Sequence, residues 1–441
     1  MKRRAVLLAT ACAALALGIA AAAAGGSRPS FTGPRDYPAG RAPLWLVAAD
    51  VNGDGRQDLV TDDYYTNAVS VLLGNGDGTF RSPVQYSAGP HPYVVVASDL
   101  DGDGKPELVT ANDDANTISV LANRGDGTFR PQVDYATPKA PEGLAAADLN
   151  GDGKPDLLVA NADADSFSVF VNKGGGTFPT REDHPTGVAP LAVAVADLNG
   201  DGKPDVVTAD GDDDTVSIFP GDGAGGFGAR TSYVTGTGPG WLAIGDLNGD
   251  GRPDLVTANT SVDSVSVLLN AGGGSFGESV DYETGVGPPF DVKLADLDGN
   301  GTGDLVTQNL FEGTVTVLSN GGDGTFEPRR DFRAGRDPIS VAVADLNGDH
   351  RPDLATANSD GDSVSVLLNA IGGCGVPSLA GQKLAAAKRA LALAGCRLGK
   401  VARAYSKYVP AGRVLSQKPG SGTLRPAGAK IDLVVSRGAR G

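Results

Sequence analysis

One nine-residue phrase returns seven times along the chain, and this repetition restricts the fold more than any other feature. The phrase reads DLNGDGKPD at Asp148 and again, unchanged, at Asp197. Close copies begin at Asp50, Asp99, Asp246, Asp296 and Asp345. Successive copies are 49 residues apart, apart from one spacing of 50. A fixed period of this size is typical of repeat proteins, in which stacked units share one continuous core.

The repeated phrase has the composition of a calcium loop. Its positions 1, 3, 5 and 9 carry Asp, Asn or Glu in every copy, and a tight loop presents such alternate side chains inward. Ca²⁺ takes six to eight oxygen ligands, so the backbone carbonyl of position 7 would complete the set. The alternative is a series of acidic surface turns, but fixed spacing over seven copies favours cation binding. The loop is not an EF-hand, because position 12 is Thr or Val where that motif needs Glu.

The expected ligands therefore recur with the repeat, and we expect up to seven Ca²⁺ ions. By loop, the residues are Asp50, Asn52, Asp54, Arg56, Asp58; Asp99, Asp101, Asp103, Lys105, Glu107; Asp148, Asn150, Asp152, Lys154, Asp156; Asp197, Asn199, Asp201, Lys203, Asp205; Asp246, Asn248, Asp250, Arg252, Asp254; Asp296, Asp298, Asn300, Thr302, Asp304; and Asp345, Asn347, Asp349, Arg351, Asp353. The sixth loop has Asn300 at position 5. The seventh has His350 at position 6, where the others have the glycine that a left-handed turn favours, so we expect the seventh site to be the weakest.

Each unit also contains four runs that are typical of β-strands. In the second unit these are Tyr93–Ser98, Leu108–Ala111, Thr117–Ala122 and Gln132–Tyr135. Four strands in about 49 residues are typical of a propeller blade, and seven blades are within the usual range. The sequence therefore predicts an all-β fold, a seven-bladed β-propeller over residues 29–371, and we expect it to be a monomer.

The two ends of the propeller complement each other. The segment FTGPRDYPAG (Phe31–Gly40) matches the fourth-strand segment FRSPVQYSAG (Phe80–Gly89), whereas no such segment follows the seventh unit's third strand (Ser363–Asn369). We therefore expect the N-terminal segment to supply the outer strand of blade 7. Such a mixed blade closes the ring and leaves no open sheet edge at its junction.

The repeats resemble the FG-GAP/VCBS family, which includes the calcium-loop blades of the integrin α-subunit propeller and of many secreted bacterial proteins. The resemblance covers all seven units and implies that the metal loops lie on one face and that ligands meet the other. The segments VPSLAGQKLAAAKRALALAGCRLGKV (Val376–Val401) and VPAGRVLSQKPGSGTLRPAGAKIDLVVS (Val409–Ser436) resemble a PASTA domain of bacterial cell-wall proteins. This second resemblance implies a small α+β domain over residues 374–441. In it we expect a helix at Gln382–Ala394, which Gly395 ends, and strands at Val414–Gln417 and Ile431–Val435.

The N-terminus has the form of a secretory signal. A basic start at Lys2–Arg4 precedes the apolar run Ala5–Ala21, and Ala22–Ala24 offers a small-residue cleavage site, so we expect residues 1–24 to be a signal peptide. The alternative is a membrane anchor, but the run is short and rich in alanine. We expect no membrane span in the mature protein, which would be extracellular or associated with the cell wall. Of the three cysteines, Cys12 lies in the expected signal peptide. The other two, Cys374 and Cys396, predict a disulfide in an exported chain.

Charge is divided unevenly along the chain. The net charge is −16, yet residues 374–441 carry 13 Lys or Arg and only one acidic residue, Asp432. A basic tail therefore follows a strongly acidic body, and the two parts have different electrostatic partners. The tail could fold onto its own propeller, attract an anionic wall polymer, or present a solvated face. We expect a wall polymer, and for the propeller a surface glycan or protein ligand; we expect no nucleic-acid partner.

No cluster of residues indicates catalysis. The three histidines, His91, His184 and His350, occur in different units at unlike positions, and no nucleophile elbow, phosphate loop or zinc pattern is present. On the face opposite the metal loops, aromatic residues follow a proline in four units: Trp45, Tyr93, Trp241 and Phe290. These rings could bind sugar or peptide, or they could plug the central channel. The sequence favours a non-catalytic binding or adhesion protein, with a polysaccharide-active lyase or hydrolase as the alternative.

Overall fold

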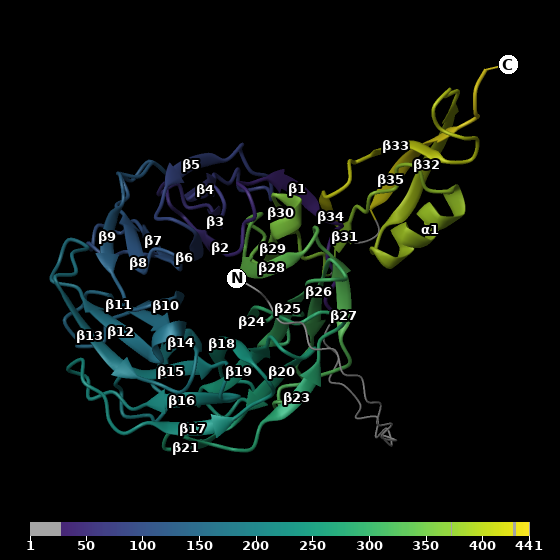
Figure 1. The fold of residues 1–441 in the computed structure, drawn as a ribbon. Coiled ribbons are helices and arrows are strands. Elements are labelled where there is room, and N and C mark those ends of the chain that lie inside the picture. The colour runs from purple at the N-terminus through teal and green to yellow at the C-terminus, as the bar shows by residue number, and fades with distance from the viewer. Residues whose placement is uncertain (1–27, 372, 427–428, 441) are drawn as a thin grey trace.

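A computed structural model describes residues 28–371, 373–426 and 429–440 of the chain. The predicted signal peptide therefore lies outside the described residues. Seven antiparallel sheets of four strands each form a ring (Figure 1), and a small domain with one α-helix follows the last sheet. This arrangement confirms the prediction of a seven-bladed propeller followed by a small α+β domain.

Each blade places its strands in the same order from the centre of the ring outward. The innermost strands are β2 (Leu46–Ala49), β6 (Pro92–Ser98), β10 (Pro141–Ala147), β14 (Pro190–Ala196), β18 (Pro239–Gly245), β24 (Val292–Ala295) and β28 (Pro338–Ala344). The second strands are β3 (Asp58–Asp63), β7 (Glu107–Asn112), β11 (Asp156–Asn161), β15 (Asp205–Asp210), β19 (Asp254–Asn259), β25 (Asp304–Asn309) and β29 (Asp353–Asn358). The third strands are β4 (Ala68–Leu72), β8 (Thr117–Leu121), β12 (Ser166–Val171), β16 (Thr215–Phe219), β20 (Ser264–Leu268), β26 (Thr314–Leu318) and β30 (Ser363–Leu367). The outer strands are β5 (Val84–Ser87), β9 (Val133–Ala136), β13 (Thr180–Pro185), β17 (Thr231–Val234), β23 (Val280–Glu283), β27 (Arg330–Arg333) and β1 (Arg35–Pro38). A short hairpin, β21 (Asn270–Gly272) and β22 (Ser275–Phe276), precedes β23.

The core lies between the blades, because the second and third strands are buried on both faces. All six residues of each second strand are buried, polar ones included. The polar residues are hydrogen-bonded to one another: in blade 5, Thr257 Oγ1 donates to Asn259 Oδ1 (2.9 Å) and Asn259 Nδ2 donates to Ser266 Oγ (2.9 Å). Ser266 Oγ then donates to Asp281 of the outer strand (2.6 Å). This network ties three strands of blade 5 together. In blades 3 and 6 the equivalent Asn161 Oδ1 and Asn309 Oδ1 have no hydrogen-bond partner among the described residues.

The first strand in the chain belongs to the last blade. β1 pairs antiparallel with β30, and Tyr37 lies opposite Val364. Farther along the same edge, Phe31 bridges Asn369, and Ser365 Oγ donates to Asp36 Oδ1 at 2.6 Å. Blade 7 therefore contains strands from both ends of the propeller segment.

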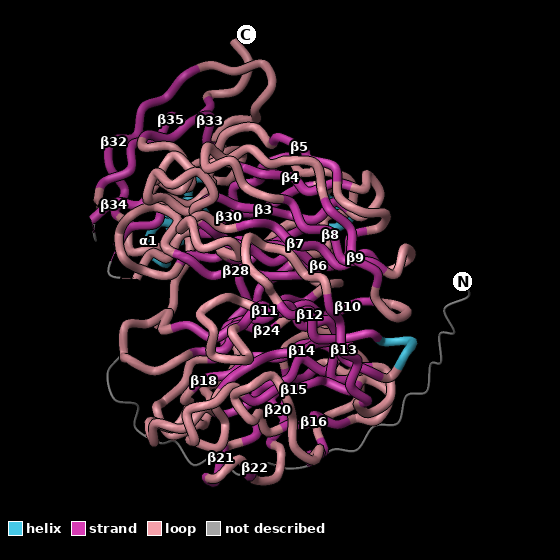
Figure 2. The backbone as a smooth tube through the Cα atoms, turned by 90° about the vertical axis from the view of Figure 1, so that its left-hand side faces the viewer, coloured by secondary structure: helices cyan, strands magenta, loops and turns pink. Residues whose placement is uncertain are grey.

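Seen from the side, the ring is a thick disc of stacked strands (Figure 2).

The tail forms a separate small domain with its own core. Its sheet has the order β32 (Arg397–Ala404), β35 (Lys430–Ser436), β33 (Val414–Lys418), and α1 (Leu384–Leu393) packs against it. A second, two-stranded sheet joins β31 (Gly373–Gly375) to β34 (Leu424–Pro426). No helix among the described residues has the length and apolarity needed to cross a membrane.

A disulfide joins Cys374 to Cys396 across this tail core, as the cysteine pair predicted. Both side chains are buried and pack with Val376, Leu379 and Leu391. A loop of about 20 residues closed by a disulfide stabilises a fold by about 3 kcal/mol in the chain-entropy model. We therefore expect the double substitution C374S/C396S to lower the free energy of unfolding of the tail by about that amount and to leave the propeller transition in place. Thiol titration of the unfolded, unreduced protein provides the check, since free thiols at both positions would contradict the disulfide.

Candidate metal loops and the opposite face

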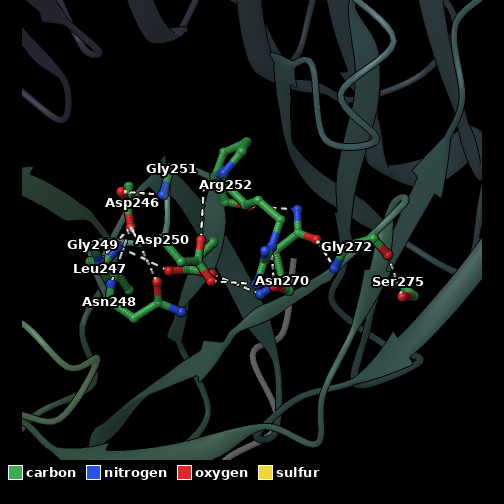
Figure 3. Close-up of polar contacts among 12 residues, drawn as sticks. Asp246, Leu247, Asn248, Gly249, Asp250, Gly251, Arg252, Asn270, Gly272 and Ser275 are labelled. Carbon is green, nitrogen blue, oxygen red and sulfur yellow. Dashed lines mark hydrogen bonds and ion pairs between the residues drawn. The ribbon is translucent and has the colours of Figure 1, made fainter.

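The seven repeated loops all lie on one face of the ring, where each connects an innermost strand to the second strand of its blade. The fifth loop shows their shared geometry (Figure 3). Asp246 Oδ1 accepts hydrogen bonds from the backbone N–H groups of Gly249 (2.7 Å) and Asp250 (3.2 Å), and its Oδ2 accepts from Gly251 (2.8 Å). Gly249 and Gly251 have φ of +76° and +81°, a conformation that favours glycine. The backbone therefore wraps around the first carboxylate of the phrase.

The acid at position 9 connects the metal loop to a second loop of the same blade. In the fifth unit, Asp254 Oδ2 accepts from the Leu247 N–H (2.9 Å), and its Oδ1 accepts from the Asn270 N–H (2.7 Å). Asp254 is fully buried, as are its counterparts in the other loops to within 2%. These counterparts are Asp58, Glu107, Asp156, Asp205, Asp304 and Asp353. The loop thus keeps one carboxylate buried beneath two exposed or half-buried ones.

Burial makes the charged form of this acid costly. It raises the pKa of Asp58 to about 6, of Asp304 to about 7 and of Asp353 to about 8. Backbone N–H donors lower each of these pKa values in part. Carboxylates of the same loop raise them again, at positions 5 and 1 in the first and seventh loops and at positions 3 and 1 in the sixth. Burial also raises the pKa of Glu107, Asp156 and Asp254. Carboxylates in this arrangement repel one another, and a bound cation would remove the repulsion.

The side chains present fit a hard divalent cation. In the second loop, carboxylate oxygens of Asp99, Asp101 and Glu107 lie within 4.8 Å of one another. The sixth loop brings Asp296, Asp298 and Asp304 together in the same way. The other five loops have Asn at position 3, and in three of these its amide nitrogen lies 2.9–3.3 Å from the position-9 carboxylate. In the seventh loop, Oδ2 of Asp349 is buried and no described residue donates to it. The second and sixth loops therefore gather three carboxylates around one point.

The seventh loop differs from the others in its backbone. His350 has φ of +63°, whereas glycine holds this position in the other six loops at φ of +80° to +88°. A residue with a Cβ atom is strained in the left-handed region by about 1 kcal/mol or more. The His350 side chain is 97% exposed and its Nδ1 lies 3.7 Å from Asp345 Oδ2. The loop keeps its shape at this energetic cost.

Asparagine side chains connect the metal loops of neighbouring blades, a feature that the sequence reasoning missed. Asn270 Nδ2 of blade 5 donates to the backbone carbonyl of Leu198 (2.9 Å), which is position 2 of the metal loop in blade 4. Equivalent bonds start from Asn123, Asn172, Asn320 and Asn369. The signal was available in the sequence, since this Asn recurs 16 residues after position 9 in five of the seven units and is Gly74 or Gly221 in the other two.

The opposite face carries the turns between second and third strands and the links between blades. Of the four aromatic residues expected there, Trp45 and Trp241 lie in blades 1 and 5 and contact each other, with ring centroids 3.8 Å apart. These blades are not adjacent, so the contact crosses the centre of the ring, and Trp45 is only 6% exposed. The contact favours the channel plug for these two residues, whereas Tyr93 and Phe290 are half-buried.

A charged pair completes the centre of the ring. The ammonium group of Lys293 lies over both tryptophan rings, 5.0 and 5.6 Å from their centroids, and 2.7 Å from Asp291 Oδ1. Burial raises the pKa of the Asp291 carboxyl, and the adjacent Lys293 lowers it in part. The other six units have Val or Ala at the position of Lys293, so comparing the units with one another could have identified it.

Comparisons with solved structures support the propeller fold. The N-terminal part of BBS1 in complex with ARL6 matches with a TM-score of 0.56 at 12% identity, over 77% of this chain and 96% of that one. Virginiamycin B lyase from Staphylococcus aureus matches with a TM-score of 0.54 at 12% identity, over 77% of this chain and 99% of that one. At these identities the likeness concerns the fold alone.

Sequence comparisons address the two parts of the chain separately. Residues 375–437 match the PASTA domain. A stretch of 63 residues is 43% identical to a probable serine/threonine-protein kinase of Clostridium acetobutylicum and corresponds to 14% of this chain and 10% of the kinase. This chain therefore spans only about a tenth of that relative. The FG-GAP-like repeat matches six overlapping segments: 50–110, 99–159, 148–208, 197–257, 246–307 and 296–356. Because these segments cover more than half of its length, the chain belongs to the FG-GAP-like repeat family.

Proposed function

We propose that this chain is an exported, calcium-stabilised propeller that binds a surface ligand without catalysing a reaction, and that its PASTA tail holds it at the cell wall. The observation that carries the proposal is the contrast between an acidic propeller and a tail with 13 Lys or Arg against one acid. PASTA domains are associated with the bacterial cell wall, whose polymers are largely anionic.

Four of the 13 basic residues of the tail belong to a patch that contains two exposed aromatic rings. Tyr405 and Tyr408 are 52% and 82% exposed. The guanidinium groups of Arg437 and Arg440 both lie 5.5 Å from the Tyr405 ring, and the Lys407 ammonium lies 4.7 Å from the Tyr408 ring. Exposed rings framed by cations can contact sugar rings and anionic groups together. We call Arg403, Tyr405, Lys407, Tyr408, Arg437 and Arg440 the tail patch.

Calcium would be held by the seven loops on the propeller face. The carboxylates at positions 1, 5 and 9 and the side chain at position 3 would supply ligands, and the ion would offset the repulsion among them. Since five loops are hydrogen-bonded to the next blade through an Asn side chain, an ion that orders a loop also orders the contact between blades.

The placement of the three histidines supports a non-catalytic role. His91 Nδ1 lies 2.7 Å from Asp114 Oδ2 on the face opposite the metal loops. His184 is stacked on Phe167, with ring centroids 4.9 Å apart, and His350 lies in the seventh metal loop. Within the described residues, the three imidazoles belong to three separate blades and do not share a site.

Charge reversal in the tail patch should release the protein from the wall. We expect Arg403→Glu, Lys407→Glu and Arg437→Glu, made together in the full chain, to abolish sedimentation with purified cell wall at 0.1 M salt. Added salt should weaken binding of the unaltered chain, because exposed charges are screened within about 10 Å at this ionic strength.

The matched control reverses three exposed arginines of the propeller, Arg81, Arg124 and Arg130. It removes the same amount of positive charge and should leave sedimentation unchanged. Equal loss in both variants would mean that net charge alone governs binding. Loss in the propeller variant only would assign wall binding to the propeller and contradict the proposal.

A further inference from the structure

A cleft of about 470 Å³ opens between blades 6 and 7 on the face opposite the metal loops. Its walls include Phe311 and Glu312 from the β25–β26 turn, Arg333 at the end of β27, Arg336 and Asp337 from the link to β28, and Asp36 of β1. Apart from Phe311 and one alanine, the lining residues are charged, Gly or Ser. The volume is within the range of small-molecule sites, but the lining offers no apolar pocket.

The repeat supplies an internal reference for these residues. At the position equivalent to Phe311, four other units have Asp and unit 5 has Ser261. Unit 1 has Tyr65, the only other aromatic residue at this position. Phe311 is 71% exposed, so packing does not require the ring. None of the other blades has a basic residue at the position equivalent to Arg333. The residues there are Ser87, Ala136, Pro185, Val234, Glu283 and Pro38. The fold therefore tolerates other residues at both positions.

The charged groups of the cleft differ in whether they already have partners. Ser365 Oγ donates to Asp36 Oδ1 (2.6 Å), and Glu312 lies 3.9 Å from the Arg329 guanidinium. Within the described residues, neither Arg333 nor Arg336 donates a side-chain hydrogen bond, although the Arg336 charge acts on the adjacent Asp337 and lowers the pKa of that carboxyl in part. The surrounding chain is also locally basic, since the eight residues Arg329–Arg336 include four arginines. Two guanidinium groups whose hydrogen-bond donors are unused match a carboxylate, with which Arg forms bidentate hydrogen bonds.

We propose that this cleft binds a carboxylate-bearing sugar, a uronic acid residue of an anionic glycan. Arg333 and Arg336 pair with its carboxylate, the exposed ring of Phe311 stacks on the C–H face of the pyranose, and Asp36 and Glu312 accept hydrogen bonds from its hydroxyl groups. The assignment rests on the proposed binding role of the propeller and names its ligand class. A peptide fits less well, because the lining has no apolar pocket for side chains.

The test is calorimetric titration of the full chain in calcium with a linear tetraglucuronate. Its methyl ester is the control ligand, since it keeps the sugar rings and removes the charge. We expect the ester to bind at least about tenfold more weakly, because charge-assisted hydrogen bonds to both arginines are lost. Tetraglucuronate that does not bind, or an ester that binds equally well, would overturn the proposal.

The variants come from the protein's own repeats, so folding is preserved. Arg333→Ser, the residue of the first unit, should weaken tetraglucuronate binding about tenfold and barely change ester binding. Phe311→Ser, the residue of the fifth unit, should weaken both ligands about fivefold. Tyr65→Ser is the matched control at the equivalent position of blade 1 and should change neither.

Two further outcomes separate this assignment from the role proposed above. If tetraglutamate binds as tightly as tetraglucuronate, or if Phe311→Ser has no effect, the cleft is a general carboxylate site and the sugar assignment is wrong. If tetraglucuronate fails to bind while the tail still sediments with cell wall, the wall attachment stands and only the cleft assignment fails.

Discussion

Removing calcium should lower the melting temperature of the propeller by on the order of 15 °C. At 1 mM Ca²⁺ and a dissociation constant of ~0.1 mM, each site contributes about 1.4 kcal/mol, and seven independent sites approach ~10 kcal/mol. The measurement follows tryptophan fluorescence during heating in calcium and in EDTA. Trp45 and Trp241 are the two tryptophans of the chain and lie in contact across the centre of the ring, so their emission reports on the ring itself.

Single loops can be tested with residues that the protein already uses. Asp201→Asn introduces at position 5 the residue that the sixth loop has naturally as Asn300. We expect it to weaken one site and to reduce the calcium-dependent stabilisation by about 1 kcal/mol. Asp212→Asn, in an exposed turn of the opposite face, removes the same charge and should have no calcium-dependent effect. A melting temperature that EDTA does not change would contradict the calcium assignment for all loops.

Deleting Phe31–Gly40 should open the ring and cause self-association. The deletion removes β1, exposes the edge of β30 and leaves Phe80 without the edge-on contact of Tyr37, whose ring centroid lies 5.5 Å away. It also removes Phe31 from its contact with Phe332. Losing two largely buried aromatic side chains costs about 3–6 kcal/mol, and an exposed strand edge is a template for pairing with another chain.

Light scattering after size exclusion and thermal unfolding measure the two effects. The matched control deletes residues 25–28, which precede the strand. It should remain monomeric with an unchanged melting temperature. If the chain without Phe31–Gly40 is also monomeric and equally stable, β1 contributes little to closure, and the side-chain contacts between blades hold the ring by themselves.

The repeat explains why the propeller could be predicted so fully from the sequence. A period of 49 residues with four β-type runs permits few other folds, and the strands expected in the second unit agree with β6–β9 to within one residue at each end. The tail was harder, because it has no repeat. The expected helix contains α1, and the two expected strands correspond to β33 and β35. β32 was missed because it is a mostly exposed edge strand, RLGKVARA, without the alternation of apolar and polar residues.

The site shows the same division between repeated and unrepeated features. The seven loops could be located because their phrase is present seven times, whereas their role as calcium ligands stays a prediction. Lys293, Asp291 and Phe311 occur once at their positions, so they stand out only as departures from the repeat, and a departure does not reveal which contacts the side chain makes. The contact of Trp45 with Trp241 depends on the diameter of the ring, because it joins blades 1 and 5 across the centre. Such contacts follow from the closed fold and not from local sequence patterns.

The distribution of asparagine bonds between blades has a mechanical consequence. Blades 1 to 3 are connected in series through Asn123 and Asn172, and blades 4 to 7 through Asn270, Asn320 and Asn369. Gly221 and Gly74 leave the junctions between blades 3 and 4 and between blades 7 and 1 without this bond. At the junction between blades 3 and 4, His184 also stands where five of the other blades have Tyr, and its ring packs with Phe167 and Phe227. Blades 7 and 1 are still joined by bonds of the Gly78 N–H to Leu346 O (3.0 Å) and of the Tyr37 hydroxyl to Gly78 O (3.3 Å). Under a pulling force, we therefore expect the ring to open first between blades 3 and 4.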